Sequence, residues 1–310
     1  MTTAEAEAAS VSRRTSAEGY WYQKGDKELG PFTVEQERQQ DFQVKLAAEF
    51  GVSVQEIQRA KHDDINRPII DPELAEILDT TIRQDYVTKS ITLKAGILTF
   101  TKQDQVNLIM SGEAAGGKSY ISLEVASFFP EDVVMIVGTS SPTAFFHDFG
   151  QWDQERKLRV IDLSRRIIIL TDQPHPLLLQ KLRALLSHDI KELLYKVTDR
   201  SKSGAHRTKN VLIIGFPTFI FCSAKTILED QELQRAFLLS PETTRVKLDE
   251  SLRLLAAKVG HRAAFTEWIN NHPQRLWLKQ RIQNIRNAML EDVTIEDEEA
   301  VYKRFVAHHP

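Results

Sequence analysis

The chain has 310 residues, of which 42% are hydrophobic and 27% are charged, with a formal net charge of −3. This balance is ordinary for a globular protein and excludes a globally basic nucleic-acid binder, so any such binding must come from a local cationic patch. The single cysteine, Cys222, excludes an internal disulfide, and no apolar run reaches the roughly 18 residues that a membrane span needs. We therefore expect a cytoplasmic protein.

The first hundred residues are expected to form an extension in front of a larger domain. Residues 1–18 are rich in Ala, Glu, Ser and Thr and are predicted to be a disordered tail. Residues 19–32 hold two aromatic-containing runs around a polar segment, which predicts a hairpin that packs its aromatic rings. Helical patterns follow at 35–49, at 53–61 with Ser53 as N-cap, and at 73–86. Residues 19–100 are too short and too interrupted to predict a second large core.

The next segment carries the most specific motif in the chain. Residues 112–119 fit the pattern G-x-x-x-x-G-K-[ST]. An apolar run at 106–110 precedes the pattern as a buried strand would, and a helix-like stretch at 120–129 follows it and stops at Pro130. Strand, glycine loop and helix are the context in which this pattern binds phosphate.

The residue types of this loop fit a nucleoside triphosphate. Glycine lets backbone N–H groups close around phosphates because a Cβ would block the turn, and the helix start adds its positive dipole end. We expect Lys118 to reach the β- and γ-phosphates of ATP and Ser119 to ligand Mg²⁺. The predicted nucleotide-binding residues are Gly112, Glu113, Ala114, Ala115, Gly116, Gly117, Lys118, Ser119 and Tyr120.

Strand-like and helical runs alternate after the glycine loop. The strand-like runs are 132–137, 157–163, 166–170, 192–198, 210–214 and 218–222, and a helical run covers 177–186. This alternation predicts an α/β fold with a mostly parallel central sheet flanked by helices. From residue 246 the pattern is helical, with a break at Pro273. We therefore expect an ATPase core over residues 101–245 and a C-terminal helical lid over residues 246–310.

Asp172 follows the buried run 166–170 and is the predicted metal-side carboxylate, because an acidic group at the end of such a strand completes a phosphate site. The sequence leaves two alternatives for the place of Asp172 in the Asp-Glu pair that usually ends such a strand. If Asp172 takes the first place of an Asp-Glu pair, Gln173 stands where the base should be and hydrolysis is expected to be slow. If it takes the second place, Thr171 replaces the metal carboxylate. We favour the first alternative, with Asp172 near Mg²⁺, and assign no residue as the catalytic base.

Two further residues are candidates for the catalytic site. Ser223 ends the strand-like run 218–222, where its hydroxyl can contact the γ-phosphate or the attacking water, or simply act as a cap. Arg235 stands at the end of a helical segment before an apolar strand, so it can project into a neighbouring subunit's ATP site as an arginine finger. The alternative for Arg235 is a surface ion pair with Glu232 or Glu229.

A cationic segment at 199–209 lies between two strand-like runs, just ahead of the Ser223 strand. A flexible hairpin tip of this charge suits contact with a nucleic-acid phosphate backbone, and the alternative is a solvated loop. The candidate nucleic-acid-binding residues are Arg200, Lys202, His206, Arg207 and Lys209. One group of candidate ligands fits no zinc pattern in its spacing: His147, His188 and His206 with Asp148 and Asp189. Mg²⁺ is therefore the one metal we expect.

With the glycine loop, Asp172, the cationic segment, Ser223 and Arg235 in this order, residues 107–258 resemble AAA+ ATPases. The resemblance is closest to the branch with a hairpin before sensor 1, which includes superfamily 3 and minichromosome-maintenance-type helicases. The segment is also similar to helicase-like replication ATPases of mobile elements. The resemblance implies a P-loop NTPase fold, a hexameric ring with ATP at subunit interfaces, and hairpins that move single-stranded or forked DNA through the pore.

The same resemblance assigns a role to each motif residue. It makes Lys118 and Ser119 the Walker A pair, Asp172 Walker B, Ser223 sensor 1 and Arg235 the arginine finger. Gln173 departs from the usual Glu, and Arg253 and Arg262 are the sensor 2 candidates. We thus expect an ATP-driven DNA helicase. The alternatives are an ATP-dependent switch that builds an assembly on DNA and, less well supported by the motifs, a small-molecule kinase.

Overall fold

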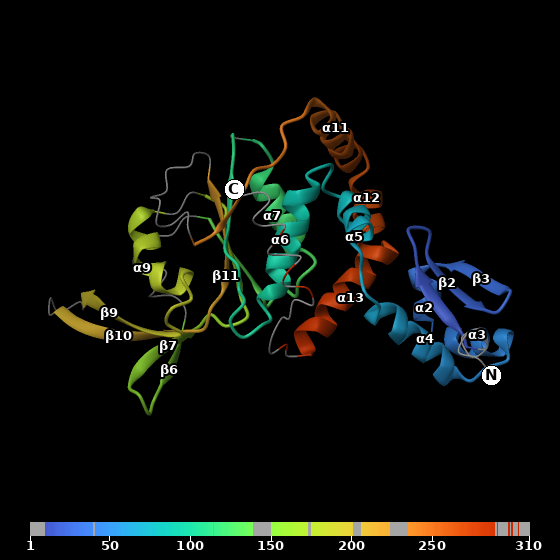
Figure 1. The fold of residues 1–310 in the computed structure, drawn as a ribbon, viewed down its shortest axis with the longest axis horizontal. Helices are drawn as coiled ribbons and strands as arrows, with labels where there is room; N and C mark the ends of the chain where they lie inside the picture. Colours follow the sequence, from blue (N-terminus) through green and yellow to red (C-terminus); the bar gives the residue numbers. More distant parts are fainter. Residues whose placement is uncertain are drawn as a thin grey trace.

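A computed structural model describes residues 10–39, 41–113, 115–138, 150–172, 175–200, 206–223 and 235–288, together with the isolated positions 290, 297, 299 and 303. The chain runs from an N-terminal module, through a central sheet covered by helices, to a group of C-terminal helices (Figure 1). Among the helices of the described ranges, none is both long enough and apolar enough to span a bilayer.

Five parallel strands form the central sheet, in the order β12–β4–β11–β8–β5. Their bounds are Leu108–Ser111 for β4, Val134–Val137 for β5, Ile167–Leu170 for β8, Thr218–Ser223 for β11 and Phe237–Leu239 for β12. Strands β4, β8 and β11 are buried at every residue, which is why their sequences are nearly continuous apolar runs. The order places β11 between the strand that enters the glycine loop and the strand that precedes Asp172.

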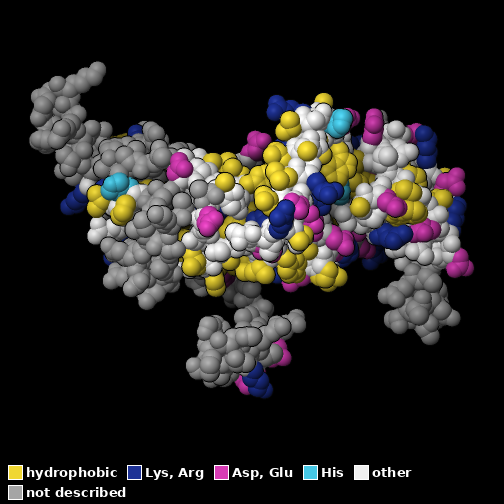
Figure 2. Space-filling view, turned by 90° about the horizontal axis from the view of Figure 1, so that it is seen from above, with side chains coloured by type: hydrophobic (Ala, Val, Ile, Leu, Met, Phe, Trp, Pro, Cys, Tyr) yellow, Lys and Arg dark blue, Asp and Glu magenta, His cyan; other side chains and the backbone are white. Residues whose placement is uncertain are grey.

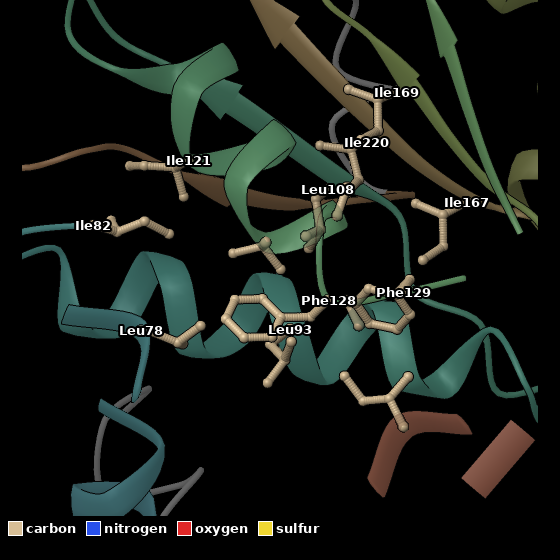
Figure 3. Packing of buried hydrophobic residues seen from close by; sticks show 14 of the residues in the cluster. Leu78, Ile82, Leu93, Leu108, Ile121, Phe128, Phe129, Ile167, Ile169 and Ile220 are labelled. Atoms are coloured by element: carbon tan, nitrogen blue, oxygen red, sulfur yellow. The ribbon is translucent and has the colours of Figure 1, made fainter. Parts of the chain in front are cut away.

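Helices cover both faces of this sheet. Because side chains alternate along a strand, Ile167 and Ile169 of β8 join one hydrophobic cluster, whereas Ile168 joins the other. Helices α6 (Tyr86–Leu98) and α7 (Lys118–Ala126) cover the first face, where Leu93 lies under the sheet (Figure 3). Helix α9 (Pro176–Leu186) covers the second face. This architecture confirms the predicted α/β fold, a central parallel sheet flanked by helices, in which the glycine loop joins β4 to α7.

A second, four-stranded sheet lies beside the first, in the order β6–β7–β10–β9. Its strands are β6 (Gln151–Asp153), β7 (Leu158–Asp162), β9 (Glu192–Arg200) and β10 (His206–Ile214). The prediction of one mostly parallel sheet is therefore wrong for the runs at 157–163, 192–198 and 210–214, which belong to this second sheet. Strand β7 buries only Ile161 and exposes Arg159, the pattern of a sheet with one face towards water.

The N-terminal module, residues 12–66, is a compact unit with its own hydrophobic cluster. It contains β1 (Ser12–Thr15), β2 (Tyr20–Lys24), β3 (Lys27–Phe32), α2 (Val34–Arg38), α3 (Phe42–Phe50) and α4 (Val54–Asn66). The aromatic hairpin is confirmed as β2 and β3. The prediction that residues 1–18 are disordered is wrong for β1, because Arg13 is buried there between the carboxylates of Glu37 and Asp64.

The C-terminal helices are α11 (Arg245–Gly260), α12 (Arg262–Asn271) and α13 (Pro273–Asn287), so their helical character is confirmed. The three helices differ in how much of their surface is buried. Helix α13 buries Trp277, Leu278 and Ile282 in the main cluster, together with residues of α5 (Asp71–Asp79). Helices α11 and α12 bury no residue, and Figure 2 shows apolar side chains gathered on the side of the molecule where α11 lies.

Candidate nucleotide-binding site

The glycine loop leaves the carboxyl end of β4 and passes directly into α7, as the motif predicts. Gly117 is the N-cap of α7 with a φ of 87°, a left-handed conformation in which a Cβ is strained. A Cβ at Gly116 would lie 3.1 Å from the carbonyl oxygen of Glu113, so this part of the loop is close-packed. Ala114 lies outside the described residues.

Lys118 is buried, and its ammonium turns back onto the loop. The Nζ donates hydrogen bonds to the carbonyl oxygens of Gly112, at 2.9 Å, and of Glu113. The ammonium therefore occupies the centre of the loop, beside the positive end of the α7 dipole. A phosphate in this position can replace the two carbonyl oxygens as its hydrogen-bond acceptor.

Ser119 and Asp172 come together at the carboxyl edge of the sheet. The Ser119 Oγ donates to the carbonyl oxygen of Thr171 at 3.3 Å, and the exposed Asp172 is the next residue along the chain. A hydroxyl and a carboxylate are oxygen ligands of the kind that Mg²⁺ prefers, so this pair fits the ion. Within the described ranges no group of three or more His, Cys, Asp or Glu side chains could hold a metal. Gln173 lies outside the described residues.

Strand β11 brings Ser223 and Cys222 to the centre of this edge. Ser223 is buried and pairs in register with Ser111 of β4. The pKa of the Cys222 thiol is raised, mainly because the thiol is buried, and the charge of Asp172 adds to this effect. The hydrogen bonds with Ser122 and Ser119 and the charge of Lys118 lower the pKa and oppose it. Strand β11 lies between β4, which leads into the loop of Lys118, and β8, which precedes Asp172.

A pocket of about 490 Å³ opens beside the glycine loop, between α7, α11 and the segment 81–85. Tyr120 lines it and donates its hydroxyl to the carbonyl oxygen of Thr81 at 2.8 Å. Apolar side chains make up much of the wall: Ile82, Ile121, Leu248, Leu254 and Leu255. A pocket of this size and lining suits a nucleoside, with its phosphates extending into the glycine loop.

Two residues of this pocket, Asp85 and Lys247, were not expected from the sequence. Lys247, in the first turn of α11, forms an ion pair with the buried Asp85 and donates to the carbonyl oxygens of Glu242, at 2.9 Å, and Gly116, at 3.4 Å. Asp85 has a φ of 53° and accepts a hydrogen bond from the Glu242 backbone N–H. No local pattern marks this pair, because its members are far apart in the sequence.

The two sensor 2 candidates lie outside the pocket beside the glycine loop. Arg253 and Arg262 are both exposed and do not line the pocket. Lys247 is the α11 cation that contacts the glycine loop in this structure.

Arg235 lies at the opposite edge of the sheet. The side chain of Asn107, just before β4, donates to the Arg235 carbonyl oxygen at 3.2 Å, and Phe237 pairs with Leu108. At about 3.3 Å per residue, β4 separates this point from the glycine loop by roughly 13 Å. The Arg235 side chain therefore does not reach the phosphate site of its own chain. It lines a second pocket of about 520 Å³ together with Gln105 and His188.

The predicted cationic hairpin corresponds to β9 and β10, which pair antiparallel with Arg200 opposite His206 at the distal end. The backbone places Arg207 and Lys209 on β10, near that end, and Lys202 lies outside the described residues. Figure 1 shows the two strands extending away from the central sheet. Strand β10 leads through a short turn into β11, so the hairpin precedes Ser223 as the sequence indicates.

No family model matches this sequence, and no curated protein matches it. Solved structures show a distant likeness. The NrS-1 C-terminal region in its apo A form is 14% identical with a TM-score of 0.37, over 97% of this chain and 73% of the other. NtrX from Brucella abortus in complex with ADP is 11% identical with a TM-score of 0.34, over 81% and 56%. JCV helicase bound to a small molecule is 12% identical with a TM-score of 0.35, over 83% and 67%. Likeness at this level says nothing of what this chain binds or does.

Proposed function

We propose that this chain is an ATP-hydrolysing DNA motor, a ring-forming helicase that moves along single-stranded DNA by means of the hairpin β9–β10. The observation that carries the proposal is the meeting of Lys118, Ser119, Asp172 and Ser223 at one edge of the sheet, beside a pocket of nucleoside size.

Each of these groups has a distinct task in hydrolysis. Lys118 and the loop amides hold the β- and γ-phosphates, and Ser223 orients the attacking water. Ser119 and Asp172 hold Mg²⁺, which when bound neutralises charge on the phosphates. We assign no residue as the base that accepts the proton from water, because Gln173 rather than a glutamate follows Asp172.

Arg235 supports an assembly of several copies. Because it lies at the far edge of the sheet from its own glycine loop, it can contact a nucleotide only in a neighbouring chain. A contact between two different edges of identical subunits is head-to-tail, and repeating it generates a ring when the rotation between subunits closes. The resemblance to AAA+ ATPases makes the expected number of subunits six.

The hairpin β9–β10 would supply the local positive surface that the overall charge of −3 lacks. We assign DNA contact to Arg200, Lys202, His206, Arg207 and Lys209, where phosphate attraction acts without regard to base sequence. In a ring, copies of this hairpin would surround one strand.

A second candidate is an ATP-dependent switch that assembles on DNA without separating strands. Gln173 favours it, because a glutamine in the place of a base slows hydrolysis and prolongs the ATP-bound state.

ATP hydrolysis with and without single-stranded DNA, together with the mass of the assembly, tests the proposal. A motor shows DNA-stimulated hydrolysis and displaces a strand from a forked duplex, whereas a switch shows no displacement. The triple variant Lys202→Glu, Arg207→Glu, Lys209→Glu should lose the stimulation. A control that reverses the exposed Lys94, Lys102 and Arg38 should keep it. Wild-type stimulation in the hairpin variant refutes the role of the hairpin.

A further inference from the structure

One wall of the pocket beside the glycine loop is a short segment around Arg83, whose backbone is fixed on both sides. Before Arg83, the Ile82 carbonyl oxygen accepts a hydrogen bond at 3.0 Å from the buried ammonium of Lys89. After Arg83, Gln84 and Asp85 take left-handed φ values of 54° and 53°, which residues other than glycine rarely adopt. Their contacts with α11 hold both residues in this strained conformation. The fold therefore sets the position at which Arg83 enters the pocket.

This segment runs alongside α11, and two contacts give its direction. Asp85 pairs with Lys247 in the first turn of α11, and Lys247 also donates to the glycine loop. The Gln84 side chain donates to the Glu250 carboxylate at 3.0 Å, about one turn farther along the helix. Each step back along the segment from Asp85 thus leads away from the glycine loop. Arg83, which comes before Gln84, therefore lies on the side of the pocket that a nucleoside would occupy, beyond its phosphates.

The walls on that side of the pocket are aromatic and apolar. Tyr120 is 40% exposed, lines the pocket, and is fixed by the hydrogen bond from its hydroxyl to the Thr81 carbonyl oxygen. Lys258, about three turns after Lys247 on α11, has its Nζ 5.8 Å from the centre of the Tyr120 ring. Leu255, one turn before Lys258, also lines the pocket. A flat and mostly apolar group such as a nucleobase fits walls of this kind.

The Arg83 side chain is half-buried, and it is available to a ligand in this pocket. Among the residues that the structure describes, none forms a hydrogen bond or an ion pair with it. Lys118 and Lys247 both donate to carbonyl oxygens of the glycine loop, so the phosphates already have two cations close to them. A guanidinium is planar, is more weakly hydrated than an ammonium, and stacks on aromatic rings. This chemistry suits the ring of a nucleobase better than a further phosphate contact.

We propose that Arg83 holds the base of the bound nucleotide, with its guanidinium stacked on the heteroaromatic ring. The inference rests on the proposed function to the extent that the glycine loop binds a nucleoside triphosphate. It adds the residue that distinguishes a nucleotide from a bare polyphosphate. Without this contact the nucleotide would be held mainly through its phosphates.

The test is calorimetric titration of the full-length chain with ATP and with inorganic tripolyphosphate, each with Mg²⁺. Tripolyphosphate has the phosphates of ATP and lacks the base. Arg83→Ala should bind ATP at least about fivefold more weakly than the wild type does, and tripolyphosphate equally well, which also shows that the variant is folded. Arg83→Lys keeps the charge but not the planar group, so its ATP affinity should stay closer to that of Arg83→Ala than to that of the wild type. The control Arg59→Ala, at an exposed position of α4, should bind both ligands as the wild type does.

Equal weakening of ATP and tripolyphosphate binding in Arg83→Ala would assign this residue to the phosphates and overturn the proposal. Unchanged ATP affinity in Arg83→Ala, or full recovery in Arg83→Lys, would overturn it as well. DNA-stimulated ATP hydrolysis of the wild type is measured separately. If that hydrolysis is absent while ATP affinity depends on Arg83, the motor is refuted and the base contact stands. If hydrolysis is present and Arg83→Ala binds ATP as the wild type does, the base contact alone is refuted.

Discussion

The Lys247 ammonium pairs with the buried carboxylate of Asp85 and also donates to the Gly116 carbonyl oxygen in the glycine loop. One side chain of α11 thus joins the segment 81–85 to the phosphate cradle. A triphosphate in the loop would compete with Asp85 for this ammonium. We therefore expect the position of α11 to respond to nucleotide.

The buried pair predicts an asymmetric effect of mutation on stability. Lys247→Met leaves the Asp85 carboxylate buried without its cation, which should lower the free energy of unfolding by about 3 kcal/mol. The double variant Lys247→Met, Asp85→Asn should recover much of that loss, because no uncompensated charge remains. Urea unfolding of both variants measures the difference. Equal losses in the single and double variants would show that the pair does not couple.

Asp172→Asn is expected to abolish ATP turnover and to spare nucleotide binding. The amide removes the anionic ligand of Mg²⁺, whereas Lys118 and the loop amides still hold the phosphates. Steady-state hydrolysis and ATP titration separate the two effects. Asp26→Asn, at the exposed tip of β2–β3, is the matched control. Turnover at the wild-type rate in Asp172→Asn removes that residue from the site.

Arg235→Ala is expected to bind ATP normally and to lose the hydrolysis that depends on assembly. Since Arg235 does not reach its own phosphate site, the loss should be repaired between chains. Mixing Arg235→Ala with Asp172→Asn creates interfaces where an intact arginine faces an intact carboxylate, so partial activity should return. Full activity of Arg235→Ala alone, or no recovery on mixing, contradicts an action across the interface.

The half-buried His188 and the buried His272 predict a loss of stability in weak acid. Burial lowers the pKa of His188, which the charge of Asp189 opposes, and burial and the charge of Arg275 lower that of His272. Below the ordinary value of about 6.5 the unfolded chain binds more protons than the folded one, so unfolding becomes easier as the pH falls. Urea unfolding should show lower stability at about pH 5.5 than at about pH 7.5, with a smaller decrease in His188→Gln. An unchanged decrease in that variant removes His188 from this account.

Local signals explain what the sequence predicts well. The glycine loop carries its own pattern, and β4, β8 and β11 are continuous apolar runs because both of their faces are covered. Asp172 follows such a run directly, so its place at the carboxyl edge could be expected.

Long-range partners explain what the sequence does not predict. The sequence places Arg13 in a predicted disordered tail. In the structure Arg13 forms ion pairs with Glu37 and Asp64, which hold β1 in the N-terminal module. Strand β7 resembles its neighbours in pattern, and its pairing with β10 assigns it to the second sheet. The sequence of α13 predicts part of a lid, whereas in the structure its Trp277 contacts α4 and packs in the main cluster. In each case a distant residue decides the structure.

Calorimetric titration of the wild-type chain and of Lys118→Ala with ATP and Mg²⁺ tests the central claim most directly. The ammonium at the centre of the glycine loop predicts one ATP per wild-type chain and at least about tenfold weaker binding in Lys118→Ala, the scale of a lost charge-assisted hydrogen bond. Absence of ATP binding by the wild type, or equal affinity of the two proteins, would contradict it.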